Sequence, residues 1–336
     1  MLILGIETSC DETSASVVED GTHILSNIVV SQEALHGRFG GVVPEIACRE
    51  HTKGIVSVIR NAIVKANINI DEIDAVSVAN TPGLIGALLI GLTAAKTLSF
   101  ALKIPLVTLN HLHAHIYACK FDHRSIDYPA ISLVVSGGHT TLFLTKSETK
   151  HEQIGRTLDD AAGEAFDKVG KILGLGYPSG PVIDTISKNG NKKAVTFPRS
   201  YLEKGSLDFS FSGVKTAVLY YCSGQDAKSG KEKPKLNDRE IADIAASFQE
   251  AVVDVLVDKT ISAALQFSVN GIIFGGGVAA NSRLRQRFGE AARQNNISLY
   301  YPPKELCIDN AAMIAGLAYH KYLEKNFSSL EIEAIP

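Results

Sequence analysis

Three histidines lie within five residues in the segment HLHAHIYA at 111–118. If this segment is helical, His111 and His115 are four residues apart and share one face, about one turn from each other, whereas His113 points elsewhere. Two imidazoles on one helix face can bind a transition metal, but a pair alone makes a poor site. The spacing therefore indicates a metal site only if another part of the chain supplies a third ligand.

Glycine-containing loops suggest a second kind of chemistry. SGGHT (136–140), GLGYPSGP (174–181) and FGGGVAANSRL (274–284) are three such loops, and TSCDETS (8–14) is a fourth turn of small polar residues. Glycine is favoured where a ligand must reach backbone N–H groups, and a turn that leads into a helix offers these donors and the positive helix end to an anion. None of the loops matches GxxxxGK[ST] or GxGxxG. Together the loops favour binding of a nucleotide or phosphate, in a site that is neither a P-loop nor a Rossmann motif.

Acidic residues accompany these loops: Asp11, Glu12, Asp159, Asp160, Asp167 and Asp184. Asp159 and Asp160 precede an expected helix, where a favourable interaction with its dipole explains them. Asp167 lies farther along that helix and Asp184 follows a glycine turn. These last two are the better candidates for binding the hydroxyls of a ribose or substrate.

Composition excludes several classes of protein. The chain has 336 residues, 21% of them charged, and a formal net charge of −3, so no overall basic field indicates a nucleic-acid partner. Its five cysteines form no CxxC pair, and their odd number suits reduced thiols in a cytosol. The N-terminus lacks the basic start of a signal peptide. The apolar run at 83–102 approaches membrane-span length, but it is rich in small residues and carries Lys96, which favours a buried core helix.

The strand pattern indicates a duplication. Residues 2–10 read as a buried strand whose antiparallel partner is 13–20, and 131–145 repeats this hairpin plan more than a hundred residues later.

Residues 223–240 have no apolar period and several lysines, so they predict a solvated loop, with a basic contact to RNA as the alternative. Other expected elements are a helix at 54–66, a strand at 75–79, a long helix or a broken pair at 240–267, a strand at 271–277 and a last helix at about 310–324.

Long motifs in one order resemble the TsaD family, the bacterial tRNA adenosine threonylcarbamoyltransferases. The resemblance runs nearly end to end. The motifs are GIETSCDETSASVV, PEIACREH (44–51), NTPGLIGALLIG (80–91), NHLHAHIYA, VSGGHT, DDAAGEAFDKVGKILGLGYPSGP, FSFSGVKT (209–216), GGGVAANSRLR and CIDNAAMIA (307–315).

The resemblance implies an α/β, actin-like ATPase (ASKHA) fold, with two duplicated RNase H-like domains and nucleotide in the cleft between them. We expect an N-terminal subdomain at 1–108, with the helix at 310–324 packing back on it. A C-terminal subdomain at 109–309 would carry the metal and nucleotide loops, with a flexible loop at 223–240.

The resemblance also assigns site residues. His111, His115 and Asp309 correspond to ligands of one metal ion per subunit, Fe²⁺ in expectation with Zn²⁺ as the alternative. Asp309 could instead cap a helix that begins at Asn310, but the resemblance favours the ligand; His113 has no implied role. The family's substrate loop is matched by Val135, Ser136, Gly137, Gly138 and His139, and its residues that contact the adenylate are matched by Asp167, Gly180, Asp184 and Asn281.

The implied reaction transfers a threonylcarbamoyl group from threonylcarbamoyl-adenylate to N6 of the adenosine just 3′ of the anticodon, in tRNAs that read codons beginning with A, and releases AMP. Asp11 or Glu12 could take the N6 proton, and Cys10 is expected to pack rather than to act as a nucleophile. The implied partners are tRNA, a paralogous inactive TsaB-like protein and a small TsaE-like ATPase, in the cytoplasm and without a membrane.

Three other functions remain as alternatives. A zinc peptidase is disfavoured because Leu112 stands where the HExxH motif has its catalytic glutamate. An ATP-hydrolysing actin-like module would explain the glycine loops but would leave the histidine pair idle. A non-catalytic scaffold of an RNA-modifying complex is the third alternative. Only the transferase would produce modified adenosine and AMP together.

Overall fold

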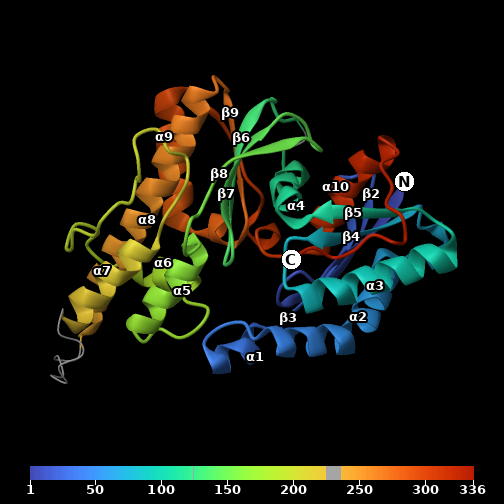
Figure 1. Ribbon diagram of the computed structural model, residues 1–336, viewed down its shortest axis with the longest axis horizontal. Helices are drawn as coiled ribbons and strands as arrows, with labels where there is room; N and C mark the ends of the chain where they lie inside the picture. Colours follow the sequence, from blue (N-terminus) through green and yellow to red (C-terminus); the bar gives the residue numbers. More distant parts are fainter. Residues whose placement is uncertain (124, 225–235) are drawn as a thin grey trace. The chain divides into compact units, whose positions relative to one another are not determined.

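The computed structural model describes residues 1–123, 125–224 and 236–336 (Figure 1). The chain forms two compact units. Unit 1 comprises residues 1–126, 146–151 and 301–336, and unit 2 comprises 127–145 and 152–300. This division differs from the expected boundary after residue 108, because the segment with the three histidines belongs to unit 1.

Unit 1 is built on a five-stranded sheet of order β3-β2-β1-β4-β5. Its strands are β1 (Leu2–Glu7), β2 (Glu12–Glu19), β3 (His23–Ser31), β4 (Ala75–Thr81) and β5 (Leu106–Asn110). The predicted hairpin is confirmed, since β1 pairs antiparallel with β2, whereas β4 pairs parallel with β1 and β5 parallel with β4. The central strand β1 is apolar on both faces because helices cover both sides of the sheet.

Two pairs of helices enclose this sheet (Figure 1). α2 (Pro44–Ala66) and α3 (Ile85–Leu102) pack on the face that carries Leu4 and Ile6. α4 (His111–Tyr117) and α10 (Ala311–Leu323) pack on the opposite face, which carries Ile3. The expected last helix therefore lies on the N-terminal sheet. The short helix α1 (Glu33–His36) links β3 to α2.

Unit 2 repeats the same strand plan, with a sheet of order β10-β9-β6-β7-β8. Its strands are β6 (Ala130–Val135), β7 (Thr140–Thr145), β8 (His151–Arg156), β9 (Gly271–Gly275) and β10 (Ser298–Tyr300). As in unit 1, the first strand pairs antiparallel with the second and parallel with the fourth. The predicted duplication is confirmed, and the chain has an actin-like α/β fold.

Five helices accompany the second sheet among the described residues: α5 (Ala162–Ile172), α6 (Gly180–Ser187), α7 (Ser212–Ser223), α8 (Asp238–Gln266) and α9 (Ser282–Asn295). The segment expected as one long helix or a broken pair is the single helix α8. The predicted flexible loop at 223–240 falls mostly on residues 225–235, outside the described residues, and its last three residues form the first turn of α8.

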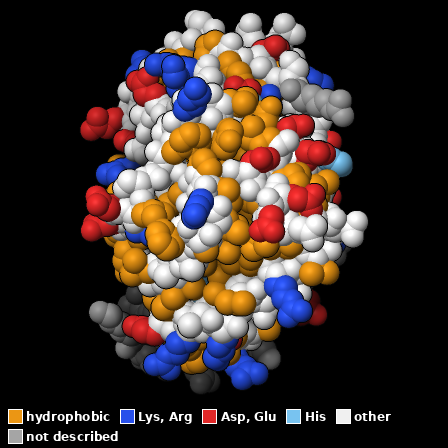
Figure 2. Space-filling view, turned by 90° about the vertical axis from the view of Figure 1, so that its right-hand side faces the viewer, with side chains coloured by type: hydrophobic (Ala, Val, Ile, Leu, Met, Phe, Trp, Pro, Cys, Tyr) orange, Lys and Arg blue, Asp and Glu red, His pale blue; other side chains and the backbone are white. Residues whose placement is uncertain are grey.

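α3 is the helix that was predicted to lie in the core, but only one of its faces is buried. Ala87, Leu92 and Ala95 are buried, whereas Leu89 and Phe100 are 48% and 74% exposed. By length and hydropathy this helix could also span a membrane, a property that core helices of globular proteins share. Figure 2 shows many hydrophobic side chains on the side of the molecule where α2 and α3 lie in Figure 1.

Candidate metal centre and nucleotide-binding loops

The predicted histidine pair lies where β5 passes into α4. The carboxyl ends of the parallel strands β1, β4 and β5 meet at one edge of the first sheet. At this edge Asn110 caps α4, because its side-chain oxygen accepts hydrogen bonds from the N–H groups of Leu112 (2.8 Å) and His113 (3.3 Å). The helix thus begins at His111, and the ring centroids of His111 and His115 lie 4.6 Å apart.

Asp309 joins the two histidines from the other end of the sequence. One ligand atom from each of the three residues lies within 4.8 Å of the others. Oδ1 of Asp309 lies 3.0 Å from Nε2 of His115 and 3.4 Å from Nε2 of His111. Asp309 is not a helix cap, since Asn310 caps α10 by accepting a hydrogen bond from the N–H of Met313 (3.2 Å). The structure thus brings the three predicted ligands together.

The charges of these three residues are strongly coupled. Burial disfavours the charged form of His111, but the carboxylates of Asp309 and Glu7 outweigh it and raise the pKa of His111 well above its usual value. Burial lowers the pKa of His115. Burial would raise the pKa of Asp309, yet the charge and hydrogen bonds of the two histidines hold it well below the usual range. The carboxylate stays ionised among nitrogen donors, a set that suits a divalent transition metal.

Glu7 and Ser9 complete the surroundings of His111, and neither was among the predicted site residues. Nδ1 of His111 lies 3.0 Å from Oε2 of Glu7 and 3.1 Å from Oγ of Ser9. The other carboxylate oxygen of Glu7 accepts a hydrogen bond from the N–H of Ser9. Glu7 is fully buried. The only signal in the sequence was the place of Glu7 at the end of a strand that enters a polar turn.

The two acidic residues predicted as bases lie in that turn, and their surroundings differ from the expectation for Glu12. Oε1 of Glu12 accepts a hydrogen bond from Oγ of Ser31 (3.2 Å). Burial and the negative charges of Asp309 and Asp11 raise the pKa of Glu12 to about 10. With that pKa the carboxyl group holds its proton at neutral pH. Burial likewise raises the pKa of the Cys10 thiol well above its usual value, so Cys10 is no thiolate.

His113, which has no predicted role, points away from the three ligands. Its ring lies 4.3 Å from that of His151, centroid to centroid. Burial, with the neighbouring His151 and Lys321, lowers the pKa of His113 to about 3. His113 is therefore a neutral side chain in a separate contact.

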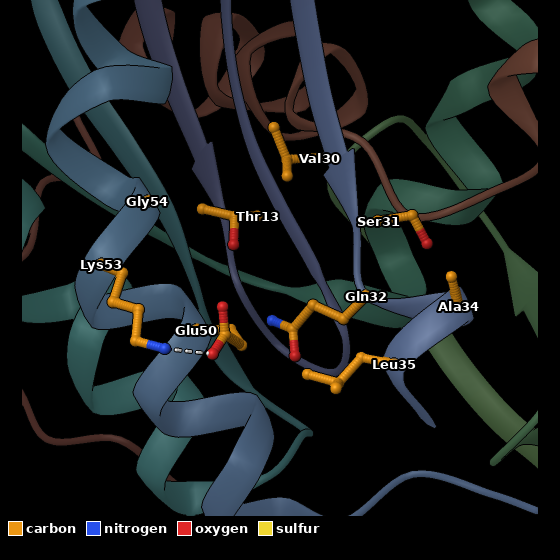
Figure 3. A pocket seen from close by; sticks show the side chains of 9 residues that line it. All are labelled: Thr13, Val30, Ser31, Gln32, Ala34, Leu35, Glu50, Lys53 and Gly54. Carbon is orange, nitrogen blue, oxygen red and sulfur yellow. Dashed lines mark hydrogen bonds and ion pairs between the residues drawn. The ribbon is translucent and has the colours of Figure 1, made fainter. Parts of the chain in front are cut away.

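A pocket of 330 Å³ lies elsewhere in unit 1, between the end of β3, α1 and α2 (Figure 3). Lys53 and Glu50 form an ion pair on one wall, and Gln32 faces them. Thr13, which also lines the pocket, is hydrogen-bonded through its hydroxyl group to Nδ1 of His51 (2.8 Å). None of the predicted site residues lines this pocket.

In unit 2, the predicted loop at 135–139 lies at the carboxyl edge of the sheet. β6 and β9 run parallel, so Val135 and Gly275 end at the same edge. Gly276 has a φ of +91°, and a side chain there would come within 2.5 Å of the carbonyl oxygen of Val135. Gly137 and Gly138 are exposed, with open space where a side chain would be. Their backbone is therefore accessible to a ligand, as expected for a phosphate-binding turn.

The predicted carboxylates of unit 2, Asp167 and Asp184, accept hydrogen bonds from residues at the starts of two helices. Asp167 accepts a hydrogen bond from the N–H of Ser179 (2.7 Å), directly before α6 and Gly180. Asp184 accepts hydrogen bonds from the N–H (3.1 Å) and Oγ (2.8 Å) of Ser282, in the first turn of α9. In the described structure both carboxylates thus stabilise the loops on which the resemblance places the adenylate.

Asn281 caps α9. Its side-chain oxygen accepts a hydrogen bond from the N–H of Leu284 (2.9 Å), and its amide nitrogen donates to Oε1 of Gln249 (2.7 Å). Both ends of the amide therefore contribute to the fold.

We predicted that Asp159 and Asp160 interact favourably with the dipole of the helix that follows them. For Asp159 this prediction is wrong. α5 begins at Ala162, whereas Asp159 accepts hydrogen bonds from the N–H of Phe211 (2.8 Å) and from Oγ of Ser212 (2.6 Å) at the start of α7. Asp160 pairs with two lysines, Lys168 (2.7 Å) and Lys215 (2.9 Å).

Solved structures with low sequence identity share the fold. Component A of (R)-2-hydroxyglutaryl-CoA dehydratase from Acidaminococcus fermentans aligns over 96% of this chain and 99% of its own, with a TM-score of 0.56 at 15% identity. HypF from T. kodakarensis aligns over 96% of this chain and 48% of its own, with a TM-score of 0.60 at 13% identity. At such identity these likenesses support the fold alone.

Sequence relatives are much closer. The family model for tRNA N6-adenosine threonylcarbamoyltransferase, TsaD, matches residues 23–316. A protein of that name from Moorella thermoacetica is 49% identical over 99% of this chain and 96% of its own length, and one from Clostridium botulinum (strain Kyoto) is 50% identical over the same shares. The chain therefore belongs to the TsaD family, and it is a transferase that modifies N6 of adenosine in tRNA with a threonylcarbamoyl group.

Proposed function

We propose that the enzyme uses threonylcarbamoyl-adenylate as donor, the adenosine just 3′ of the anticodon as acceptor, and a divalent metal held by His111, His115 and Asp309. The convergence of these three residues is the observation that supports the proposal most strongly. The donor is a mixed anhydride with a good leaving group, and the acceptor is a weakly nucleophilic amine. Catalysis therefore depends on aligning the two reactants and stabilising developing negative charge.

The metal is proposed to be Fe²⁺, with Zn²⁺ as the alternative. Two imidazole nitrogens and one carboxylate oxygen suit either ion and leave coordination positions open, as in catalytic rather than structural sites. When bound, such an ion supplies a Lewis acid for donor oxygens. Burial of His111 and His115 limits the access of water to two of the three ligands.

The loops of unit 2 are proposed to hold the adenylate. Gly137 and Gly138 are exposed, and their N–H groups would stabilise the negative charge of the departing AMP. Val135, Ser136 and His139 belong to the same loop, and Asp167, Gly180, Asp184 and Asn281 shape the neighbouring helix starts. Asp11 and Glu12 lie where the polar turn after β1 leads into β2, and one of the two is proposed as the base that takes the N6 proton.

The resemblance is the basis for the proposed partners, a paralogous TsaB-like protein and a small TsaE-like ATPase. The tRNA substrate supports a cytoplasmic location. The acceptor base must leave the stack of the anticodon loop, which is easier in a single-stranded loop than in a duplex.

The test is a transfer assay with purified donor, unmodified tRNA and both proposed partner proteins. The His111→Ala, His115→Ala double variant should lose bound metal and at least about 10²-fold of its transfer rate, while circular dichroism shows an unchanged fold. The His113→Ala variant is the matched control from the same helix and should keep both properties. ATP hydrolysis by the wild type without formation of modified adenosine would instead support the ATP-hydrolysing module.

A further inference from the structure

The two nitrogens of the His111 ring have different kinds of partner. Nε2 points toward Asp309 and Nε2 of His115, whereas Nδ1 points away from them, toward Glu7 and Ser9. A metal-bound imidazole is neutral, so the ring has given up the proton of the nitrogen that binds the metal and keeps one proton on the other nitrogen. The partner of Nδ1 therefore decides which nitrogen is available to the metal.

We infer that Glu7 is a positioning residue of the metal centre, whose carboxylate keeps the proton of His111 on Nδ1 and thereby leaves Nε2 free as the ligand. This inference rests on the proposed metal site. A carboxylate only accepts hydrogen bonds, so the Nδ1–H of His111 can donate to Oε2 at 3.0 Å. Metal-binding histidines commonly donate their second N–H in this way, which fixes the ring and raises its basicity.

Glu7 is itself held firmly. It ends the central strand β1, its side chain is fully buried, and the N–H of Ser9 donates to its second oxygen. A buried carboxylate with both oxygens engaged has little freedom to follow a moving ring. The position of the His111 ring is thus tied to the sheet of unit 1 rather than to the short helix α4 alone.

His115 provides the contrast within the same site. Its Nδ1 is buried and has no hydrogen-bond partner among the described residues, so no carboxylate holds its ring on the side away from Asp309. The packing of α4 against α10 positions this second ligand instead. The two histidines are therefore supported in different ways, and a change at Glu7 should act on His111 alone.

A purely structural role for Glu7 would have a different consequence. If the residue only satisfied the N–H of Ser9, its replacement would change stability and leave the affinity of the folded protein for metal unchanged. Glu7→Gln preserves shape and an acceptor oxygen for Ser9, but its NH₂ group can also donate to Nδ1. That bond favours the ring form whose proton is on Nε2, where it competes with the metal.

The experiment measures the dissociation constants of Zn²⁺ and Co²⁺ by competition with a chromogenic chelator, together with the Co²⁺ absorption spectrum and the melting temperature of the metal-free protein. Asp74→Asn is the matched control, because it is a carboxylate-to-amide change at the other end of β1, where Asp74 accepts a hydrogen bond from the N–H of Leu2 (2.7 Å). We expect Glu7→Gln to weaken metal binding by about 10–100-fold and to alter the Co²⁺ spectrum. Asp74→Asn should change neither.

Metal binding to the wild-type protein distinguishes a failure of the inference about Glu7 from a failure of the proposed metal site. If wild-type protein binds metal and His115→Ala weakens it, but Glu7→Gln binds as tightly as wild type, the inference about Glu7 is wrong and the proposed metal site stands. If wild-type protein binds no metal, the proposed metal site and the inference fail together. Should Glu7→Gln not fold, Glu7→Asp decides, since the shorter carboxylate withdraws from His111 with its charge intact. Unchanged affinity in that variant would equally refute the inference.

Discussion

Replacing Gly5 by alanine should disturb both the fold and the proposed metal centre. Gly5 lies in the middle of β1, and a Cβ there would come within 2.3 Å of the carbonyl oxygen of Ala311 and 2.8 Å of the amide nitrogen of Ala315. Ordinary contact for such an atom begins at 3.4 Å, so α10 would have to move away by roughly 1 Å. Both blocking atoms are helix backbone, which cannot rotate aside as a side chain can.

The size of the effect follows from this geometry. Overpacking in a core costs about 1–3 kcal/mol, and because backbone must move here we expect about 3 kcal/mol. For a unit of this size, about 2–4 °C per kcal/mol converts this to a melting temperature about 6–12 °C lower. Asp309 lies two residues before α10 begins, so its carboxylate should also withdraw from the two histidines and metal binding should weaken.

The measurements are thermal unfolding and a metal titration, with Gly54→Ala as the control. Gly54 lies within α2 of the same unit and has open space where a side chain would be. Alanine there should be neutral or should stabilise by about 0.4–1 kcal/mol. If Gly5→Ala melts within 2 °C or so of the wild type and binds metal normally, the close contact of α10 with β1 is not as described.

Three further outcomes are expected. Asp160→Asn should destabilise unit 2 by about 1 kcal/mol at pH 7, measured by urea unfolding. Burial would raise the pKa of Asp160, but the hydrogen bonds from Lys168 and Lys215 lower it overall. The ionised carboxylate therefore contributes its full stability above the ordinary pKa of ~3.9, and this stability is lost as the pH falls through the lower pKa of the folded state. A difference in unfolding free energy between wild type and Asp160→Asn that grows in acid would contradict this. Asn281→Ala should cost about 1–2 kcal/mol, since it removes the cap of α9 and the bond to Gln249, whereas Asn281→Asp should keep the cap and lose less in the same unfolding assay. Removing metal with a chelator should lower the melting temperature of wild-type protein, because a ligand present at 100 times its dissociation constant stabilises by about 2.7 kcal/mol; an unchanged melting temperature would argue against a bound ion.

The order of elements was largely predictable because it depends on local patterns. The apolar run at 2–10 followed by alternation at 13–20 predicts the β1–β2 hairpin, and its repetition at 131–145 predicts the duplicated topology. The four-residue spacing of His111 and His115 predicts a shared helix face, since it depends only on the helical repeat. The exposed face of α3 was not predicted, because its composition is apolar all round and carries no periodic signal.

The site was predictable only where one segment or a family likeness provided it. Glu7 reaches His111 across 104 residues and Asp309 reaches His115 across 194 residues, so no local pattern links them. The resemblance supplied Asp309, whereas Glu7 needed the sheet geometry that sets the end of β1 beside the start of α4. The protonated state of Glu12 likewise depends on burial and on the distant charge of Asp309.

Unit 1 joins residues 1–126 with residues 301–336, which are far apart in the sequence, and this affects the timing of its folding during translation. While the ribosome is still adding residues 127–300, the face of the first sheet that α10 will cover, including Ile3 and Val107, has no helix from residues 301–336 to pack against it. The nascent chain must therefore keep an apolar surface out of aggregates until residues 301–336 emerge. Only then can Asp309 join His111 and His115, so the proposed metal site cannot form before residue 309 has been synthesised.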